Sequence, residues 1–371
     1  CPQEKQCESK CIHLKMGEPA VAIGYLERFA ADFERESGNI VIPEIGQSKG
    51  IKVAAVGSGP AGLSFAGEMA KKGYDVTVFE ALHEIGGVLK YGIPEFRLPN
   101  KIVDVEIENL KKMGVKFITD CIIGKTISVE QLEDDGFKGI FIASGAGLPN
   151  FMGIPGENLI NIMSSNEYLT RVNLMDAANP TTDTPINIGH NVIVVGGGNT
   201  AMDSCRTARR LGGNVTLVYR RSEKEMPARA EEVKHAKEEG INFLTLHNPL
   251  EYIADENGAV KQVRLQEMKL GEPDESGRRR PKPIPGAIKT IDADQVIVAV
   301  GVSPNPLVPK SVEGLTLGRK STIVVNTEMQ SSRPEIYAGG DIVRGGATVI
   351  LAMGDGRRAA ENMDKQLSGN K

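Results

Sequence analysis

The sequence predicts an α/β fold with doubly wound parallel sheets, because short apolar runs alternate with segments of helical spacing. The same succession of apolar run, glycine-rich turn and helix occurs twice, first from residue 52 and again from residue 191. Repetition of one supersecondary unit implies two domains of the Rossmann-like, dinucleotide-binding type. Residues 1–49 differ, since they predict a helix over 20–36 with a stop at Gly38.

The length and composition are those of a globular enzyme. The 371 residues are enough for about two to three domains, and 40% of them are hydrophobic. With 44 basic and 48 acidic side chains the net charge is −4, so the basic excess of a nucleic-acid binder is missing. No apolar run approaches the roughly 20 residues that span a bilayer. We expect a soluble cytoplasmic protein without nucleic-acid or membrane partners.

The predicted elements fall into two units. The first has strands at 52–56, 74–79, 115–119 and 139–144, with helices at 61–72 and 101–113. The second has strands at 192–195, 215–219 and 295–300, helices at 200–211 and 230–239, and a hairpin over 251–270. A strand at 336–338 and a helix at 348–366 are expected to complete the first unit.

Two further expectations concern organisation. The run of three arginines at 278–280, with the prolines after it, could be an anion site, but a solvated loop between hairpin strands is favoured. The predicted division of the chain is 1–49, 50–150 for the first part of one domain, 151–302 for the second domain, and 303–371 for the rest of the first.

The first glycine turn, residues 57–62, has the G-x-G-x-x-G spacing between a predicted strand and a predicted helix. Gly57 permits the tight turn, Gly59 lets the backbone approach a pyrophosphate, and Gly62 allows the helix to pack closely on the strand. Glu80 ends the next strand 23 residues after Gly57, where a carboxylate can accept hydrogen bonds from ribose hydroxyls. A glycine turn without a ligand is the alternative.

Two features favour FAD over a nicotinamide dinucleotide at the first turn. The pair Pro60-Ala61 follows the second glycine, and the fold is completed far downstream by Gly339-Gly340-Asp341. A strand that ends there can place Asp341 against the ribitol hydroxyls. The helix that begins near Thr348 and Val349 points its positive end towards the flavin N1–O2 edge, where charge appears on reduction.

The second glycine turn starts at residue 196, and its candidate dinucleotide contacts are Gly198, Asn199, Thr200 and Ala201. The same interval of 23 residues reaches Tyr219, which is followed by Arg220 and Arg221. Two guanidiniums stand where the first unit has an acid, and they match the charge and geometry of a 2′-phosphate. The sequence therefore predicts NADP(H) here, with Arg229 as a weaker candidate for the same phosphate. An exposed arginine pair is the alternative.

FAD in one half and NADP(H) in the other predict one chemistry, hydride transfer from NADPH to flavin N5 followed by onward passage of electrons. The cofactors supply this chemistry, so we assign no catalytic acid, base or nucleophile. A second hypothesis is a non-catalytic assembly subunit that binds both nucleotides without turnover.

Three of the five cysteines, Cys1, Cys7 and Cys11, crowd the first eleven residues. Clustered thiols in a chain without a secretory leader favour a metal site over disulfides. The chain also begins at a cysteine without an initiator Met, so we expect a fragment of a longer protein.

Further motifs are spread along the chain: 1–11 (CPQEKQCESKC), 23–29 (IGYLERF), 86–99 (GGVLKYGIPEFRLP), 154–157 (IPGE), 219–221 (YRR), 225–228 (EMPA) and 299–301 (AVG). Together with the two glycine turns they resemble the small (β) subunit family of NADPH-dependent glutamate synthase. The resemblance covers essentially the whole chain. The wider family includes the large subunit of ferredoxin–NADP transhydrogenase, a sulfide dehydrogenase subunit and the N-terminal half of dihydropyrimidine dehydrogenase.

This resemblance implies roles for further residues. It implies that Gly87, Val88 and Arg97 lie along the FAD, that Thr348 and Val349 meet the flavin end, and that Gly301 helps to receive the nicotinamide. It also implies electron transfer to a partner subunit, either the glutamate synthase large subunit or a ferredoxin-type protein. A ferredoxin–NADP transhydrogenase or sulfide dehydrogenase subunit is the alternative within the family.

The resemblance also implies two [4Fe–4S] clusters in an N-terminal α-helical iron–sulfur domain, of which residues 1–49 are a remnant. Cys1, Cys7 and Cys11 match the second cysteine group of that domain, and Glu27 falls near a non-cysteine ligand of some relatives. The first cysteine group has no match in this sequence. Because each cluster needs four ligands, the ligand set in this chain is expected to be incomplete.

Overall fold

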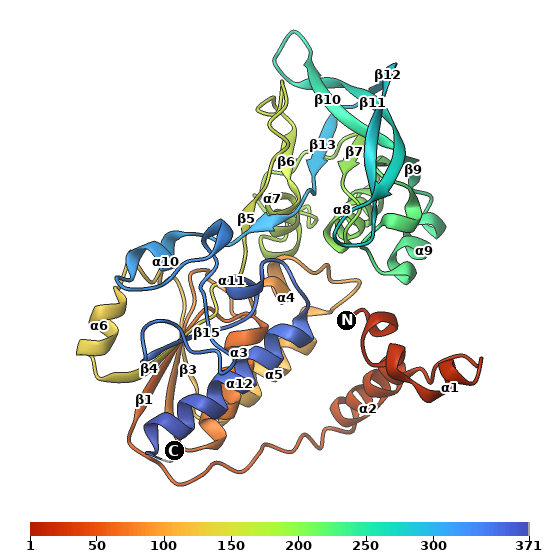
Figure 1. The fold of residues 1–371 in the computed structure, drawn as a ribbon. Helices are drawn as coiled ribbons and strands as arrows, with labels where there is room; N and C mark the ends of the chain where they lie inside the picture. The colour runs from red at the N-terminus through yellow and green to blue at the C-terminus, as the bar shows by residue number, and fades with distance from the viewer. Residues whose placement is uncertain (370–371) are drawn as a thin grey trace.

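The computed structural model describes residues 1–369 and contains two five-stranded parallel sheets, one in each half of the molecule (Figure 1). The first sheet has the strand order β15-β4-β1-β2-β3. Its strands are β1 (Lys52–Val56), β2 (Asp75–Phe79), β3 (Lys116–Ile118), β4 (Phe137–Ile142) and β15 (Ile336–Ala338). In β1 and β2 every residue after the first is buried, as expected for parallel strands covered on both faces. The predicted α/β fold is confirmed.

Helices cover both faces of the first sheet. On one face lie α3 (Pro60–Lys71), α5 (Asn100–Lys112) and the C-terminal α12 (Val349–Leu367), with Phe65 of α3 stacked on Phe141 of β4 at 4.6 Å between ring centroids. On the other face lie α6 (Val129–Asp134) and α10 (Leu307–Ser311). Strand β15 pairs with β4, so the C-terminal segment adds a strand to the first sheet.

The second sheet has the order β6-β13-β7-β8-β9. Its strands are β6 (Ile162–Ser164), β7 (Asn191–Val195), β8 (Asn214–Tyr219), β9 (Asn242–Thr245) and β13 (Gln295–Val298). One face is covered by α7 (Ser165–Leu169), α8 (Asn199–Arg210) and α9 (Ala230–Glu238). The other face is covered by an antiparallel sheet of β10 (His247–Ala254), β11 (Val260–Pro273) and β12 (Arg279–Asp292), which Figure 1 shows above β7 and β13.

One expectation about this antiparallel sheet is wrong. The arginine run and the prolines after it do not form a solvated loop, because Arg279 begins strand β12 and Pro281 and Pro283 pair with β11. Strand β12 lies at the edge of its sheet, where a proline is tolerated because its missing N–H can face away from the neighbouring strand. The predicted hairpin of β10 and β11 is present, and β12 extends it to three strands.

Two short crossovers connect the halves. They are β5 (Leu148–Pro149) and β14 (Val302–Ser303), which pair antiparallel with each other. The amide of Asn150 donates to the carbonyl of Gly301 at 3.0 Å, and the Ser303 hydroxyl donates to Asn150 Oδ1 at 2.8 Å. Gly301 therefore lies in the connection between the two sheets.

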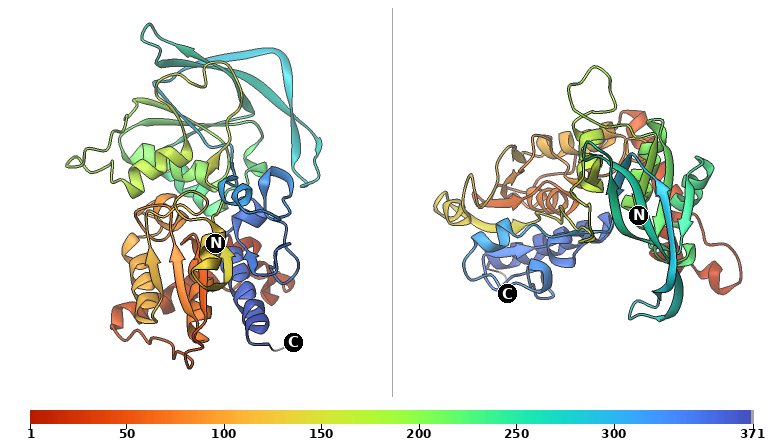
Figure 2. Two further views of the ribbon diagram at one scale, coloured as in Figure 1. Left: turned by 90° about the vertical axis from the view of Figure 1, so that its left-hand side faces the viewer. Right: turned by 90° about the horizontal axis from the view of Figure 1, so that it is seen from above.

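The first 51 residues form an arm with helices, which Figure 1 shows below the second half and to the right of α12; Figure 2 shows two further views. It contains α1 (Ile12–Lys15) and α2 (Ile23–Ser37), and residues 39–51 have no regular structure before β1. The predicted stop of α2 is confirmed, because Gly38 adopts a left-handed φ of 70° after its last turn. Leu26, Phe29 and Phe33 are more than half exposed. No helix within residues 1–369 combines the length and the apolar composition that crossing a membrane requires.

Candidate functional site

The first glycine turn connects β1 to α3. Gly57 has a φ of +103°, and a Cβ there would lie 2.5 Å from the carbonyl oxygen of Ala143. A Cβ on Gly62 would lie 1.9 Å from the carbonyl oxygen of Gly57, so the helix is packed against the turn. A Cβ on Gly59 would meet nothing within 4 Å in the described part of the chain. The start of α3, with Pro60 as its first residue, is therefore open where backbone amides can face an anion.

Glu80 joins this turn to the segment after β2. Its Oε2 accepts hydrogen bonds from the amide of Ser58 at 2.9 Å and from the Ser58 hydroxyl at 2.5 Å, and its Oε1 accepts one from the amide of Leu82 at 2.9 Å. The Ser58 hydroxyl in turn accepts from the amide of Gly86 at 2.9 Å. The carboxylate is buried at 6% exposure, and it fixes the turn; its predicted contact with a ribose stays a prediction. The role of Ser58 was not predicted.

The segment 86–91 folds back over the first turn. Gly87 has a φ of +54° and precedes the short helix α4 (Val88–Tyr91), and its Cβ position lies 2.9 Å from Gly59 Cα. Val88 is 36% exposed. Burial, aided by the charges of Asp341 and Glu80, raises the pKa of Tyr91 to about 12. Tyr91 was not predicted, although the charges of Asp341 and Glu80 both act on its hydroxyl.

The turn after β15 meets the same site from the C-terminal side. Gly340 has a φ of +76°, and its Cβ position lies 3.1 Å from the Cβ of Ala61. Asp341 begins α11 (Asp341–Arg344), accepts a hydrogen bond from the amide of Ala347 at 3.0 Å, and has its pKa raised by burial. The structure thus brings Asp341 next to the first glycine turn.

A buried carboxylate holds this second turn in place. Asp355 of α12 is 1% exposed and accepts a hydrogen bond from the amide of Gly340 at 3.1 Å. Its two oxygens also accept bonds from Nε and Nη2 of Arg344, at 2.7 and 2.6 Å. Asp355 was not among the predicted residues, although it lies between two glycines in the sequence of α12.

The N-terminus of α12 touches the cysteine-containing arm. Thr348 precedes Val349, the first residue of α12, and the Thr348 hydroxyl accepts a hydrogen bond from Gln6 Nε2 at 3.2 Å. The arm also contacts the second half, where the hydroxyl of Tyr25 is bonded to Glu231 and Glu4 lies 3.6 Å from Arg229. The arm is therefore anchored to both halves.

The second glycine turn connects β7 to α8 and repeats the features of the first. A Cβ on Gly196 would lie 2.3 Å from the carbonyl oxygen of Ala299, and Ala201 is fully buried against the core. A Cβ on Gly198 would meet nothing within 4 Å among the described residues. Asn199 accepts a hydrogen bond from the amide of Arg229 at 2.9 Å, while Thr200 is exposed. The helix start is open, as in the first turn.

The two arginines after β8 differ in their surroundings. Arg220 is exposed, whereas Arg221 is buried, with a side chain 8% exposed. Arg221 Nη2 lies 2.7 Å from Asp274 Oδ2, and Nε and Nη1 are buried with no hydrogen-bond partner within residues 1–369. Arg229 lies nearby in sequence and pairs with Glu231 at 2.8 Å. Buried donors without partners indicate a place for an additional acceptor.

A network of charged side chains connects the two halves along their boundary, which we call the seam. Arg97, from the loop after α4, donates from Nη1 to both carboxylate oxygens of Asp203 in α8, at 2.6 and 2.7 Å. Its Nε lies 3.4 Å from Glu232 of α9, which also pairs with Arg206 at 2.5 Å. Burial raises the pKa of Asp203 to about 6, although Arg97 acts in the opposite direction. Arg97, predicted along the FAD, is thus held by acids of the second half.

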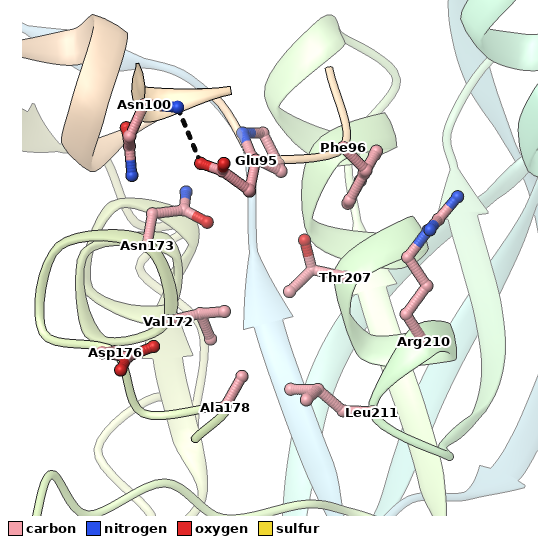
Figure 3. A pocket seen from close by; sticks show the side chains of 11 residues that line it. Glu95, Phe96, Asn100, Val172, Asn173, Asp176, Ala178, Thr207, Arg210 and Leu211 are labelled. Carbon is pink, nitrogen blue, oxygen red and sulfur yellow. Dashed lines mark hydrogen bonds between the residues drawn. The ribbon is translucent and has the colours of Figure 1, made fainter. Parts of the chain in front are cut away.

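Beside this network the seam contains a cavity of about 370 Å³. Figure 3 shows Asn100, Asn173 and Val172 on one side of it and Thr207 and Leu211 on the other, with Glu95 above and Ala178 below. Phe96 stacks on the guanidiniums of Arg206 and Arg210 at its rim, with 4.6 and 4.2 Å to the ring centroid. None of the predicted site residues lines this cavity.

The cysteines of the arm do not form a metal centre in this structure. Cys1 and Cys7 are exposed, Cys11 is partly buried, and all three thiols are free. Within residues 1–369 they do not converge with other histidine, cysteine or acidic side chains into a group that could hold a metal ion. The residues present therefore do not fit a complete [4Fe–4S] site, which requires four ligands.

Two strand–glycine turn–helix units on two parallel sheets define a protein of the dinucleotide-binding fold class. Comparison with known proteins agrees. The model for the pyridine nucleotide-disulphide oxidoreductase family matches residues 51–356, and that for dihydropyrimidine dehydrogenase domain II, 4Fe-4S cluster, matches residues 1–39. The chain belongs to the pyridine nucleotide-disulphide oxidoreductase family and, within it, to the small chains of NADPH-dependent glutamate synthase.

Particular relatives support this assignment. A putative glutamate synthase [NADPH] small chain of Cereibacter sphaeroides is 36% identical over 98% of this chain and 88% of its own length. The beta subunit of an NADP(+)-dependent formate dehydrogenase of Moorella thermoacetica is 38% identical, and this chain spans only 53% of that protein. The structure of Mycobacterium tuberculosis FprA in complex with NADPH has a TM-score of 0.73 at 18% identity, over 86% of this chain and 85% of that one.

As a member of this family the chain is an NADPH-dependent flavin oxidoreductase with FAD and NADP(H) as cofactors. The resemblance stated from the sequence motifs is confirmed by these comparisons. A fragmentary match to a 4Fe-4S domain at the N-terminus is also confirmed.

Proposed function

We propose that the protein accepts hydride from NADPH at the second glycine turn, reduces FAD at the first, and delivers electrons to a partner subunit. The observation that carries the proposal is the contrast between the residues that follow β2 and those that follow β8, where the ribose of each dinucleotide is predicted to bind. The first carries the buried carboxylate of Glu80, whereas the second carries Arg220 and the partly unsatisfied guanidinium of Arg221. Bound FAD would supply the redox chemistry, so the chain itself has only to bind, orient and exclude water.

The residues around the first turn fit FAD, because an open helix start lies between the buried Glu80 and the partly buried Asp341. We propose that it is held by Gly57, Gly59, Pro60, Ala61, Gly62, Glu80, Gly87, Val88, Arg97, Gly340, Asp341, Thr348 and Val349. The N-terminus of the 19-residue helix α12 would favour negative charge at the flavin end.

The residues around the second turn fit NADP(H) for a related reason. An open helix start at Gly198 lies in the same half as two arginines, and Arg221 has buried donors without partners. We propose that the nucleotide is held by Gly198, Asn199, Thr200, Ala201, Arg220, Arg221, Arg229 and Gly301. The 2′-phosphate would meet the arginines because their fork geometry matches a phosphate dianion.

The organisation of the chain is part of the proposal. The paired crossovers β5 and β14 support a division into 50–150 with 303–371 for FAD and 151–302 for NADP(H), preceded by residues 1–49. The relatives are named as chains or subunits, which supports an electron-accepting partner such as the glutamate synthase large subunit or a ferredoxin-type protein. Cys1, Cys7 and Cys11 would then contribute to a [4Fe–4S] site only together with further ligands. Exposed free thiols favour the cytoplasm.

The test is an anaerobic titration of FAD-loaded full-length protein with NADPH and, separately, with NADH, followed by flavin absorbance. We expect bleaching by NADPH and a much weaker response to NADH. Arg221→Ala should weaken NADPH binding by roughly 10- to 100-fold, the range expected for charged hydrogen bonds, and leave NADH nearly unchanged. Arg220→Ala is the matched variant, and its smaller effect would reflect the exposure of that side chain.

The other outcomes separate the parts of the proposal. Equal bleaching by both nucleotides would keep the oxidoreductase and remove the 2′-phosphate argument. Bound FAD that neither nucleotide bleaches would favour the assembly-subunit hypothesis.

A further inference from the structure

The turn between β11 and β12 places one carboxylate on Arg221. Asp274 Oδ2 lies 2.7 Å from Arg221 Nη2, although the two residues are 53 positions apart. The other oxygen, Oδ1, accepts hydrogen bonds from the amide and hydroxyl of Ser276, at 2.9 and 2.5 Å, and from the amide of Arg278 at 3.3 Å. The turn therefore fixes Asp274 through one oxygen and presents the other to the arginine.

Asp274 is the one acidic partner of Arg221 among residues 1–369. The Ser276 hydroxyl, and after it Arg221, hold the pKa of Asp274 well below its usual range, so the carboxylate is charged at neutral pH. A guanidinium has five N–H donors. Here one nitrogen is paired with Asp274, and Nε and Nη1 are buried without a partner.

The position of this contact matters for anion binding. Nη2 belongs to both edges along which a guanidinium forms two parallel hydrogen bonds to an oxyanion. A carboxylate on Nη2 therefore competes with a phosphate for one of those edges and adds like-charge repulsion. The arginine is kept paired in the free protein, and an incoming anion has to share it or displace Asp274.

We propose that Asp274 is a specificity-determining residue that lowers the affinity of the second site for a 2′-phosphate by acting as the internal counterion of Arg221. The inference rests on the proposed function, because it takes the second glycine turn as the NADP(H) site. Its consequence is that the antiparallel sheet, and not only the glycine turn and β8, sets how strongly NADPH is preferred over NADH. Selectivity of this kind is a difference between two affinities, to which a repulsive group contributes directly.

The experiment compares adenosine 2′,5′-bisphosphate with 5′-AMP by calorimetric titration of FAD-loaded full-length protein. Asp274→Asn keeps an acceptor at Oδ1 for Ser276 and Arg278, so the turn should be preserved, and the thermal midpoint checks this. We expect the variant to bind the bisphosphate about tenfold more tightly, with 5′-AMP unchanged. Glu275→Gln is the matched control, because it removes the same charge from an exposed neighbour on the same turn.

The outcomes are distinguishable from a failure of the proposed function. Wild-type protein that binds both probes equally would remove the 2′-phosphate site itself. Wild-type protein that discriminates, with an Asp274→Asn variant that binds the bisphosphate equally or more weakly, would overturn the inference alone. An equal gain in Glu275→Gln would also overturn it, since the effect would then be one of net charge. If Asp274→Asn lowers the midpoint, Asp274→Ser, which also keeps a hydroxyl acceptor, replaces it in the same comparison.

Discussion

Arg97 divides its guanidinium between two acids of the opposite half, with Nη1 on both oxygens of Asp203 at 2.6 and 2.7 Å and Nε 3.4 Å from Glu232. Asp203 is 4% exposed and Glu232 is 5% exposed, so the contact is desolvated. Because Arg97 comes from the first half and both acids come from helices of the second half, these contacts link the positions of the two glycine turns.

Asp203 gives the first prediction, which concerns pH. Its pKa of about 6 in the folded protein is higher than the value of about 4 in an unfolded chain. Between these values the folded protein holds a proton that the unfolded chain has lost, so the free energy of unfolding falls as pH rises and levels off above about 6. The folded and unfolded pKa values differ by about 2, which corresponds to a fall in the free energy of unfolding of about 3 kcal/mol.

Asp203→Asn should remove this pH dependence, because an amide does not titrate. The measurement is urea unfolding, followed by circular dichroism, of wild type and variant between pH 4.5 and pH 8. The difference in the free energy of unfolding between wild type and Asp203→Asn should change with pH below pH 6 and stay constant above pH 7. A difference that is flat over the whole range, or that matches Asp134→Asn at an exposed site, would contradict the prediction.

Two glycines in α12 should respond in opposite ways to alanine. A Cβ on Gly356 would lie 2.3 Å from the carbonyl oxygen of Ala61 in α3, so Gly356→Ala forces the two helices apart. We expect it to destabilise the protein by about 1–3 kcal/mol and to weaken FAD retention. A Cβ on Gly354 meets nothing within 4 Å in the described chain, so Gly354→Ala should stabilise by about 0.5–1 kcal/mol. Thermal midpoints check both, and equal shifts would be the contrary result.

Asp355 is predicted to support FAD binding from outside the glycine turn. Asp355→Ala leaves the amide of Gly340 without its acceptor and Arg344 without its carboxylate, which should cost about 1–3 kcal/mol of stability. The turn that carries Asp341 would loosen, and the fraction of FAD retained after gel filtration should fall. Asp355→Asn should fall between wild type and Asp355→Ala, since it keeps one acceptor. Full FAD retention in Asp355→Ala would show that the turn holds without this residue.

The aromatic pair on α2 should be dispensable for folding. Phe29 and Phe33 are 69% and 67% exposed, with their rings stacked at 6.4 Å. Replacing both by Ser should change the free energy of unfolding by less than about 0.5 kcal/mol each. Phe65→Ala, at a fully buried site, should cost about 3–5 kcal/mol as the control. A large loss of stability from the α2 variants would show that these rings are covered in solution.

Local sequence patterns predicted much of the fold of this protein. The two glycine turns, the alternation of strands and helices, the α2 stop at Gly38 and the return of the C-terminal strand to the first sheet all appear in the structure. Each depends on neighbouring residues, because a strand, a tight turn and a helix start are specified by periodicity and backbone freedom within a few positions. The loop expected at the three arginines was wrong, since three prolines near it masked an edge strand.

By itself, the sequence determined the two sheets, the two open helix starts and the contrast between Glu80 and the arginine pair, all of which follow from short-range order along the chain. Only the tertiary structure decided that Arg97 meets Asp203, that Asp274 meets Arg221 and that Asp355 supports Gly340. The first two pairs are separated by 106 and 53 positions. Such contacts depend on how whole helices and strands pack against one another. Periodicity and turn signals are local, so they do not predict which charged side chains are buried together.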